Sequence, residues 1–209
     1  MNQPDVTMMY AVHNAFRRDL SRMRSATADL NKPAVRKAMT TCWHTFYRYL
    51  SIHHTAEDEA LWPPMRKKLG GHEQAERLLG QMVDEHSALD PLLEEIDNAL
   101  RQGQSARLDS LFVELTDVLG NHFEHEETAA LPLVRQTLST REWDAFGADQ
   151  RRRIGFRGAA WFFPWLLDEA PQDIRDFVLS LVPPPVRLVN RMLWEPRYRR
   201  ARPMFVLRS

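Results

Sequence analysis

The stretches HHTAEDEALWP, from His53 to Pro63, and HFEHEETAALP, from His122 to Pro132, repeat one pattern within a chain of 209 residues. Aligned without gaps, they share a histidine, a glutamate, an alanine and a proline, at the pairs His53/His122, Glu57/Glu126, Ala60/Ala129 and Pro63/Pro132. The histidine and the glutamate stand four residues apart, and residues with this spacing share one face of a helix. The repeat therefore predicts two helices that each direct an imidazole and a carboxylate the same way, which suits a metal ion inside a helix bundle.

The repeat extends upstream, because a further histidine precedes each pair at a similar separation. These residues are His13 in the first half and His86 in the second, and each heads an apolar stripe at helical spacing. Internal repetition of this kind indicates a duplicated structural unit. We expect the unit to be a helix, a turn and a second helix.

Four long amphipathic helices are predicted from the apolar periodicity and from the turn residues between the periodic segments. They should run from near Asp5 to before Lys32-Pro33, from about Pro33 to Leu69, from after Gly70-Gly71 to near Gly103, and through the stretch from Leu111 to Ala130. A kink or local break is expected at Pro63-Pro64, and a kink at Pro91. No strand pattern precedes residue 139. The expected fold is all-α, an antiparallel four-helix bundle over residues 1–139.

Residues 140–209 differ in character and are expected to form a helical, Pro-broken extension. Short helices are predicted for Thr140–Arg153 and Gln172–Val182, on either side of the aromatic stretch GFRGAAWFFPWLLDEAP. The favoured interpretation is that this stretch packs on the bundle through Trp161, Phe162, Phe163 and Trp165. The alternative is a peripheral contact with an anionic membrane or a partner protein, helped by Trp194 and by a basic tail. The tail arginines are Arg187, Arg191, Arg197, Arg199, Arg200, Arg202 and Arg208, against the single acid Glu195.

Composition excludes several classes of protein. The 28 basic and 28 acidic residues cancel, so bulk charge gives no reason to expect a nucleic-acid partner. The single Cys42 rules out an intramolecular disulfide framework and fits a reducing compartment. The N-terminal stretch has no secretory pattern, and no run approaches the roughly 20 apolar residues of a membrane span. We therefore expect a cytoplasmic protein without a membrane span.

The inward faces of the four helices carry six candidate metal ligands, four imidazoles and two carboxylates. They are His13, His53, Glu57, His86, His122 and Glu126. A mixed set without thiolates argues against a structural zinc site, and six ligands are too many for one tetrahedral ion. Two ions bridged by the carboxylates would use all six and leave positions open for water, oxygen or peroxide.

Other polar residues near the motifs are alternatives. His54 and Asp58 also stand four residues apart, but the second copy of the motif favours the frame of His53. Asp90 and His125 are additional candidate ligands. Tyr49 lies one turn before His53 on the same helix face. Three roles are open for it: direct coordination of the metal, a hydrogen bond to a metal-bound ligand, or packing alone. His44 and His72 have no partner at a useful spacing and are interpreted as surface or structural residues.

Together these residues resemble the hemerythrin family, in its bacterial form with an HHE cation-binding domain. The matching features are His13, His53 to Glu57 with the trailing LWP, Glu85-His86, and His122 to Glu126 with the trailing LP; they cover about residues 5–138. The resemblance implies two non-haem iron ions, oxo- or hydroxo-bridged. It places His13 and His53 on one iron, His86 and His122 on the other, and Glu57 and Glu126 between them.

The resemblance also implies a function in binding or reacting with O2, peroxide or NO, as a redox sensor or in peroxide detoxification. Oxygen-carrying members have a fifth histidine one turn from the helix-three histidine, where this chain has Met82 and Asp90. The missing histidine favours redox or peroxide chemistry, including catalase-like peroxide decomposition, over reversible oxygen carriage. The alternative function is an iron-sensing or iron-centre repair module that acts through a partner of the C-terminal extension.

Overall fold

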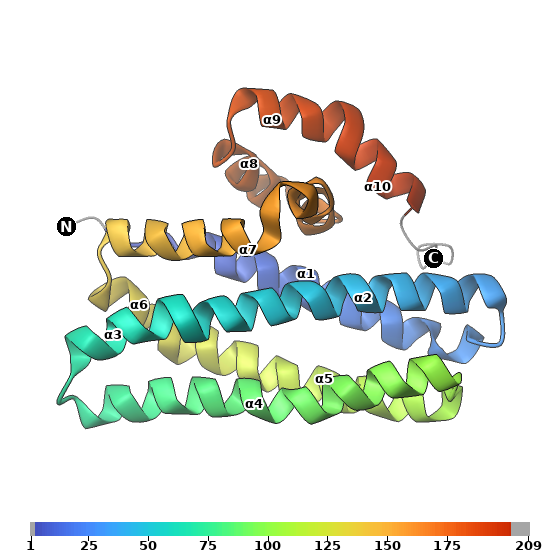
Figure 1. Cartoon of the computed structure of the whole chain (residues 1–209), viewed down its shortest axis with the longest axis horizontal. Coiled ribbons are helices and arrows are strands. Elements are labelled where there is room, and N and C mark those ends of the chain that lie inside the picture. The colour runs from blue at the N-terminus through green and yellow to red at the C-terminus, as the bar shows by residue number, and fades with distance from the viewer. Residues whose placement is uncertain (1–2, 202–209) are drawn as a thin grey trace.

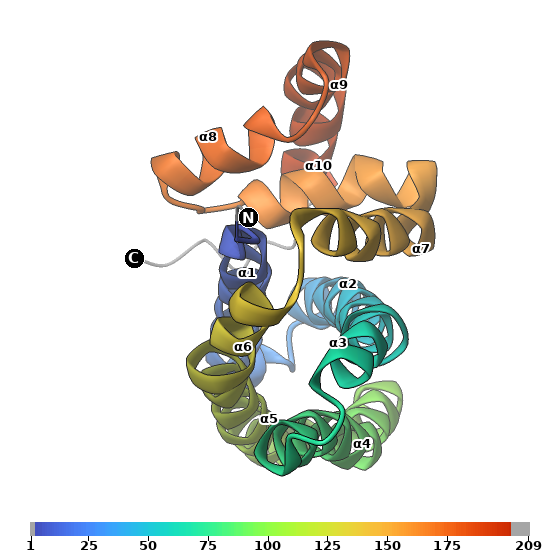
Figure 2. The ribbon, with the colours of Figure 1, turned by 90° about the vertical axis from the view of Figure 1, so that its left-hand side faces the viewer.

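The computed structural model describes residues 3–201, and these residues form helices and turns without any strand. The bundle consists of four long rods that begin with α1 (Thr7–Ala26), α2 (Pro33–Ala56), α4 (Glu73–Gln102) and α5 (Ser105–His125). Figure 1 shows the rods side by side and alternating in direction, and Figure 2 shows α1 and α2 stacked over α5 and α4. The predicted all-α, antiparallel four-helix architecture is confirmed.

The helix ends follow from local chemistry. Asp5 accepts a hydrogen bond from the Thr7 amide at 3.0 Å, at the start of α1. Pro33 opens α2, where its missing N–H has no cost. Gly103 ends α4 with a φ of 68°, in the left-handed region that glycine adopts without strain. The rod of α4 continues through Pro91.

Both copies of the sequence motif form a π-helical turn that ends two residues before their proline. The turns are Glu57–Leu61 and Glu126–Ala130, and they lead into α3 (Trp62–Leu69) and α6 (Leu131–Thr137). The carbonyls of Glu57 and Glu126 accept hydrogen bonds from amides five residues further on. Because proline lacks an N–H and its ring crowds the preceding turn, one wider turn lets the helix continue. Of the kink or local break expected at Pro63-Pro64, the structure shows a local π turn, and the rod continues past the prolines.

The bundle interior divides into two apolar clusters with a polar layer between them. The larger includes Phe16, Trp43, Phe46 and Phe112, and the smaller includes Trp62, Met65, Leu79 and Leu131. Along α1, Met9 belongs to the smaller cluster and Phe16 to the larger, and the buried His13 lies between them. His86 has the corresponding position in α4. The candidate ligands therefore occupy a layer closed by apolar side chains on both sides.

The C-terminal extension consists of α7 (Thr140–Leu167), α8 (Gln172–Ser180), α9 (Pro184–Val189), a π turn at Asn190–Trp194 and α10 (Glu195–Ala201). Ser139 and Glu142 form a reciprocal capping box at the start of α7. Pro171 and Pro183 precede α8 and α9, as expected of a Pro-broken extension, whereas α7 continues through Pro164 and is interrupted at Gly155, with a φ of 68°. Glycine adopts this conformation at little cost, and helix resumes through the aromatic stretch. Arg202 and Arg208 lie outside the described residues.

The extension packs on the bundle, as the favoured interpretation predicted. Trp165 is 1% exposed, and its ring lies 5.2 Å from that of Phe16 and 4.9 Å from that of Tyr49. Its indole N–H donates a hydrogen bond to the buried Asp19 at 2.7 Å. Within the described residues, no helix is both long and apolar enough to cross a membrane.

We predict that Trp165→Ala lowers the free energy of unfolding by about 3–5 kcal/mol, because it opens a cavity against α1 and α2. Phe156→Ala, at a position 83% exposed on the same helix, should change it by less than about 0.5 kcal/mol. Urea denaturation of the two variants and the wild type measures both effects. Equal stabilities of all three proteins would show that α7 contributes nothing to the bundle core.

Candidate metal centre

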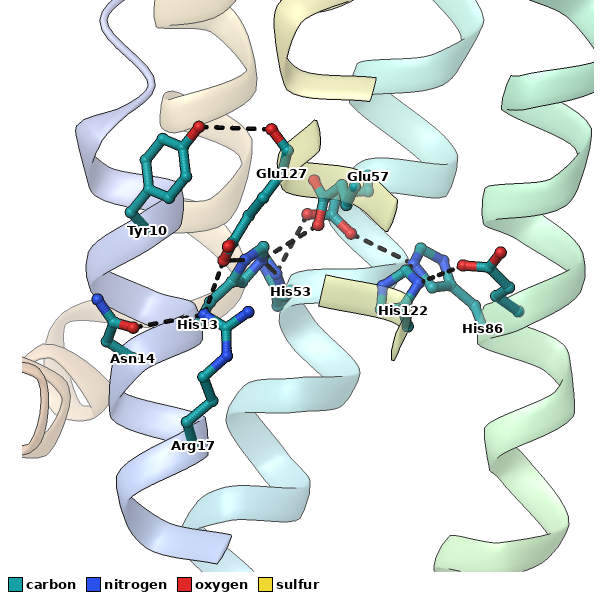
Figure 3. Close-up of polar contacts among 11 residues, drawn as sticks. Tyr10, His13, Asn14, Arg17, His53, Glu57, His86, His122 and Glu127 are labelled. Carbon is teal, nitrogen blue, oxygen red and sulfur yellow. Dashed lines mark hydrogen bonds and ion pairs between the residues drawn. The ribbon is translucent and has the colours of Figure 1, made fainter. Parts of the chain in front are cut away.

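The four rods bring all six predicted side chains into one buried layer. His13 comes from α1, His53 from α2, His86 from α4 and His122 from α5. Glu57 and Glu126 are the first residues of the two π turns, and both are fully buried. Figure 3 shows His13 and His53 on one side of Glu57, and His86 and His122 on the other.

The first group of ligand atoms joins α1, α2 and both π turns. His13, His53, Glu57 and Glu126 each offer one atom, and all these atoms lie within 4.8 Å of one another. His13 Nε2 lies 3.0 Å from His53 Nε2 and 3.1 Å from Glu126 Oε2. His53 Nε2 lies 3.2 Å from Glu57 Oε1. Two imidazoles and two carboxylates thus converge on one point.

The second group consists of three imidazoles, His54, His86 and His122, which also offer atoms within 4.8 Å of one another. His86 Nε2 lies 3.2 Å from His122 Nε2 and 3.4 Å from Glu57 Oε2. Because its other oxygen faces His53, Glu57 spans the two groups. The structure places His53 with Glu57, as the preferred frame has it, and it also buries the alternative His54 in this layer.

An outer set of carboxylates holds three of the imidazoles in orientation. Glu127 lies 2.8 Å from His13 Nδ1, Asp58 lies 2.9 Å from His86 Nδ1, and Glu85 lies 2.8 Å from His122 Nδ1. Each contact uses Nδ1 and leaves Nε2 directed into the layer. Carboxylate partners of this kind fix the ring orientation and the tautomer of metal-binding histidines.

Sequence reasoning missed Glu127 as a site residue and considered Asp58 only as an alternative inner ligand, although the repeat carries the signal of both. In each copy an acidic residue directly follows the inner glutamate, as Glu57-Asp58 and Glu126-Glu127. The inner member faces the layer, and the outer member contacts a histidine of another rod.

The remaining candidates lie away from the layer or at its margin. Tyr49 donates a hydrogen bond to the Gly158 carbonyl at 3.2 Å, so it packs against the extension. His125 Nδ1 contacts Glu85 Oε1 at 2.7 Å and is about a third exposed, which places it in the outer shell. Asp90, His44 and His72 are exposed.

The two inner carboxylates carry more negative charge than the layer offsets without a cation. Both oxygens of Glu57 and both of Glu126 are buried and make no hydrogen bond among the described residues, and only Glu126 has an ion-pair contact that lowers its pKa, with His13 at 3.1 Å. Burial raises the pKa of Glu57 well above its ordinary value, and the neighbouring Glu126 raises it further. Burial lowers the pKa of His53 and His54, with a further contribution from the surrounding imidazoles. Burial alone would lower the pKa of His13, but Glu126 and Glu127 outweigh it and raise the pKa.

These properties fit a metal centre. Buried carboxylates without donors are costly, and divalent cations supply the missing charge. Imidazoles with low pKa values are neutral at pH 7, as metal ligands must be. A thiolate-free set of imidazole and carboxylate donors suits iron, manganese or zinc.

Comparison with known protein families matches residues 5–134 to the hemerythrin HHE cation binding domain. The chain belongs to the hemerythrin family. No curated protein and no solved structure matched the chain. The hemerythrin domain covers the four rods and ends within α6, so the extension from α7 onward lies outside it.

Burial of His54 contributes acid sensitivity to the metal-free protein. Because the folded pKa of His54 lies below the ordinary value of 6.5, the unfolded chain takes up a proton near that pH and the folded chain does not. This difference contributes a term that lowers the free energy of unfolding as the pH drops below 6.5. His54→Gln removes this term, so the wild-type value should fall about 1.4 kcal/mol per pH unit more steeply than that of the variant.

Denaturation of both proteins in chelator from pH 7.5 to pH 5 measures the difference. Parallel curves for the two proteins would contradict a depressed pKa at His54.

Proposed function

We propose that this hemerythrin domain holds two iron ions and binds or reacts with a small molecule such as O2, H2O2 or NO. The observation that carries the proposal is the pair of buried carboxylates that make no hydrogen bond among the described residues and face four imidazoles. In this proposal His13 and His53 hold one ion, His86 and His122 hold the other, and Glu57 and Glu126 bridge them. The contacts of Glu57 support its bridging role, because its two oxygens face histidines of different groups.

A pair of iron ions with open coordination positions would supply ligand binding and electron transfer to oxygen species. The chain's own residues determine what reaches it. Phe123 stacks on His13 at 4.2 Å, Phe16 lies beside His53, and apolar clusters close both sides of the layer. Every inner ligand is nearly or fully buried, which favours diatomic molecules and peroxide over larger substrates.

The outer carboxylates support a redox role for the metal centre. Asp58, Glu85 and Glu127 keep three imidazoles oriented and raise their basicity, which favours oxidised metal ions. We therefore propose redox sensing or peroxide decomposition rather than oxygen storage. The buried free thiol of Cys42 supports a reducing compartment such as the cytoplasm.

Replacing either bridging glutamate should lower the iron content. We predict that Glu57→Ala and Glu126→Ala each hold fewer than two iron ions per chain after anaerobic reconstitution, because each removes a shared ligand. Elemental analysis and the absorption spectrum before and after peroxide measure occupancy and reactivity.

The matched control is Glu124→Ala, which removes an exposed carboxylate from α5 and should keep full occupancy. Two ions per chain in both bridging variants would contradict the assignment, and a wild type without iron would contradict the proposed function.

A second role is favoured by the outer face of the extension. Leu188, Met192 and Leu193 are each at least 59% exposed on α9 and the following π turn. Exposed arginines border them, namely Arg187, Arg191, Arg197 and Arg200. Figures 1 and 2 show α9 at the outer edge of the molecule, away from the bundle. Trp194, expected to join such a contact, is instead 8% exposed, and its ring stacks with that of Phe163.

We propose that this basic apolar face rests on an anionic membrane surface. A second copy of the chain would bring arginine against arginine, whereas anionic lipid headgroups complement the basic border and acyl chains receive the leucines and methionine. Such a contact would provide the partner interaction of a sensing module.

The wild type should sediment with phosphatidylglycerol-containing vesicles, and less so with phosphatidylcholine alone or at high salt. Met192→Asp should reduce vesicle binding, while Val118→Asp, on the exposed surface of α5, should not. Binding that is equal for both vesicle types would contradict the proposal. Self-association that Met192→Asp abolishes, without vesicle binding, would assign the face to a second copy instead.

A further inference from the structure

We infer that His54 is a fifth imidazole ligand, supplied by α2 to the metal position of His86 and His122. The inference rests on the proposed function, and it gives the two positions different numbers of histidines. His53 and His54 are consecutive residues, so their side chains leave α2 about 100° apart. His53 joins the group that includes His13, and His54 joins the group of His86 and His122.

The surroundings of His54 differ from those of an ordinary core histidine. The residue is 7% exposed, and its Nε2 atom is buried without a hydrogen-bond partner among the described residues. Buried polar atoms normally have such a partner. Its ring lies 4.0 Å from that of His86 and 5.2 Å from that of His122. Its lowered pKa, caused first by burial, leaves the imidazole neutral.

The second copy of the motif has a different residue at the position of His54. In the gapless alignment His54 corresponds to Phe123. Phe123 stacks on His13 with ring centroids 4.2 Å apart and planes 15° apart, and His54 stacks on His86 at 4.0 Å and 8°. The two positions therefore share one packing role, a flat ring laid on the upstream histidine. Only His54 adds a nitrogen donor to that role.

The neighbours of His86 along α4 cannot supply this donor. Met82, one turn before it, belongs to the smaller apolar cluster, and Asp90, one turn after it, is exposed. A third imidazole reaches this position from the adjacent rod instead. The apparent loss of a histidine from the helix of His86 is thus compensated by the second residue of the His53-His54 pair.

The replacement His54→Phe separates ligation from stacking, because it reproduces the arrangement at Phe123. We expect the wild type to bind two Fe(II) ions per chain in anaerobic equilibrium dialysis against a competing chelator. In His54→Phe the affinity for one of the two ions should fall at least tenfold, and the other should be little changed. The control His44→Ala removes an exposed histidine from the same helix and should match the wild type.

If the larger ring prevents folding, His54→Ala provides the second test. In this variant free imidazole, which supplies a nitrogen donor, should restore the affinity for the weakly bound ion. Benzene, which only fills the cavity, should not restore it. Two ions of wild-type affinity in either variant would overturn the role of His54 and leave the proposed function standing. A wild type that binds no Fe(II) would overturn both.

Discussion

The burial of two carboxylates side by side among imidazoles is the constraint on which the hemerythrin layer depends. Glu57 and Glu126 are fully buried and make no hydrogen bond among the described residues; His13 pairs with Glu126, but the charge of Glu57 opposes folding until a cation offsets it. The apolar clusters on either side of the layer exclude water. They therefore strengthen the repulsion between the two carboxylates and also the attraction of each carboxylate to a cation. Metal binding and folding are therefore coupled in this domain.

The prolines that end the two motifs help to position the ligands on which this coupling depends. A π turn accommodates each proline, and the inner glutamate is the first residue of that turn in both halves. Wider turns of this kind are frequent at functional sites. The residue after each glutamate then faces outward to a histidine of another rod, as Asp58 does for His86. A single short motif thus places a ligand and an orienting carboxylate.

The duplicated motif was sufficient to predict the four rods and the six side chains that share the layer. The same motif favoured His53 over His54 as the ligand. The second copy has a histidine opposite His53 but Phe123 opposite His54. The π turns escaped prediction since their cause, a proline lacking a donor, equally permits a break. In the extension the chain is interrupted at Gly155 and passes through Pro164, because bundle contacts of Trp165 hold that helix in place.

Anomalous diffraction at the iron edge, from crystals of the iron-loaded protein, tests the two-ion centre most directly. The account predicts two peaks about 3.5–4 Å apart between the carboxylates of Glu57 and Glu126, one beside His13 and one beside His86. A single peak, or peaks away from this layer, would contradict it.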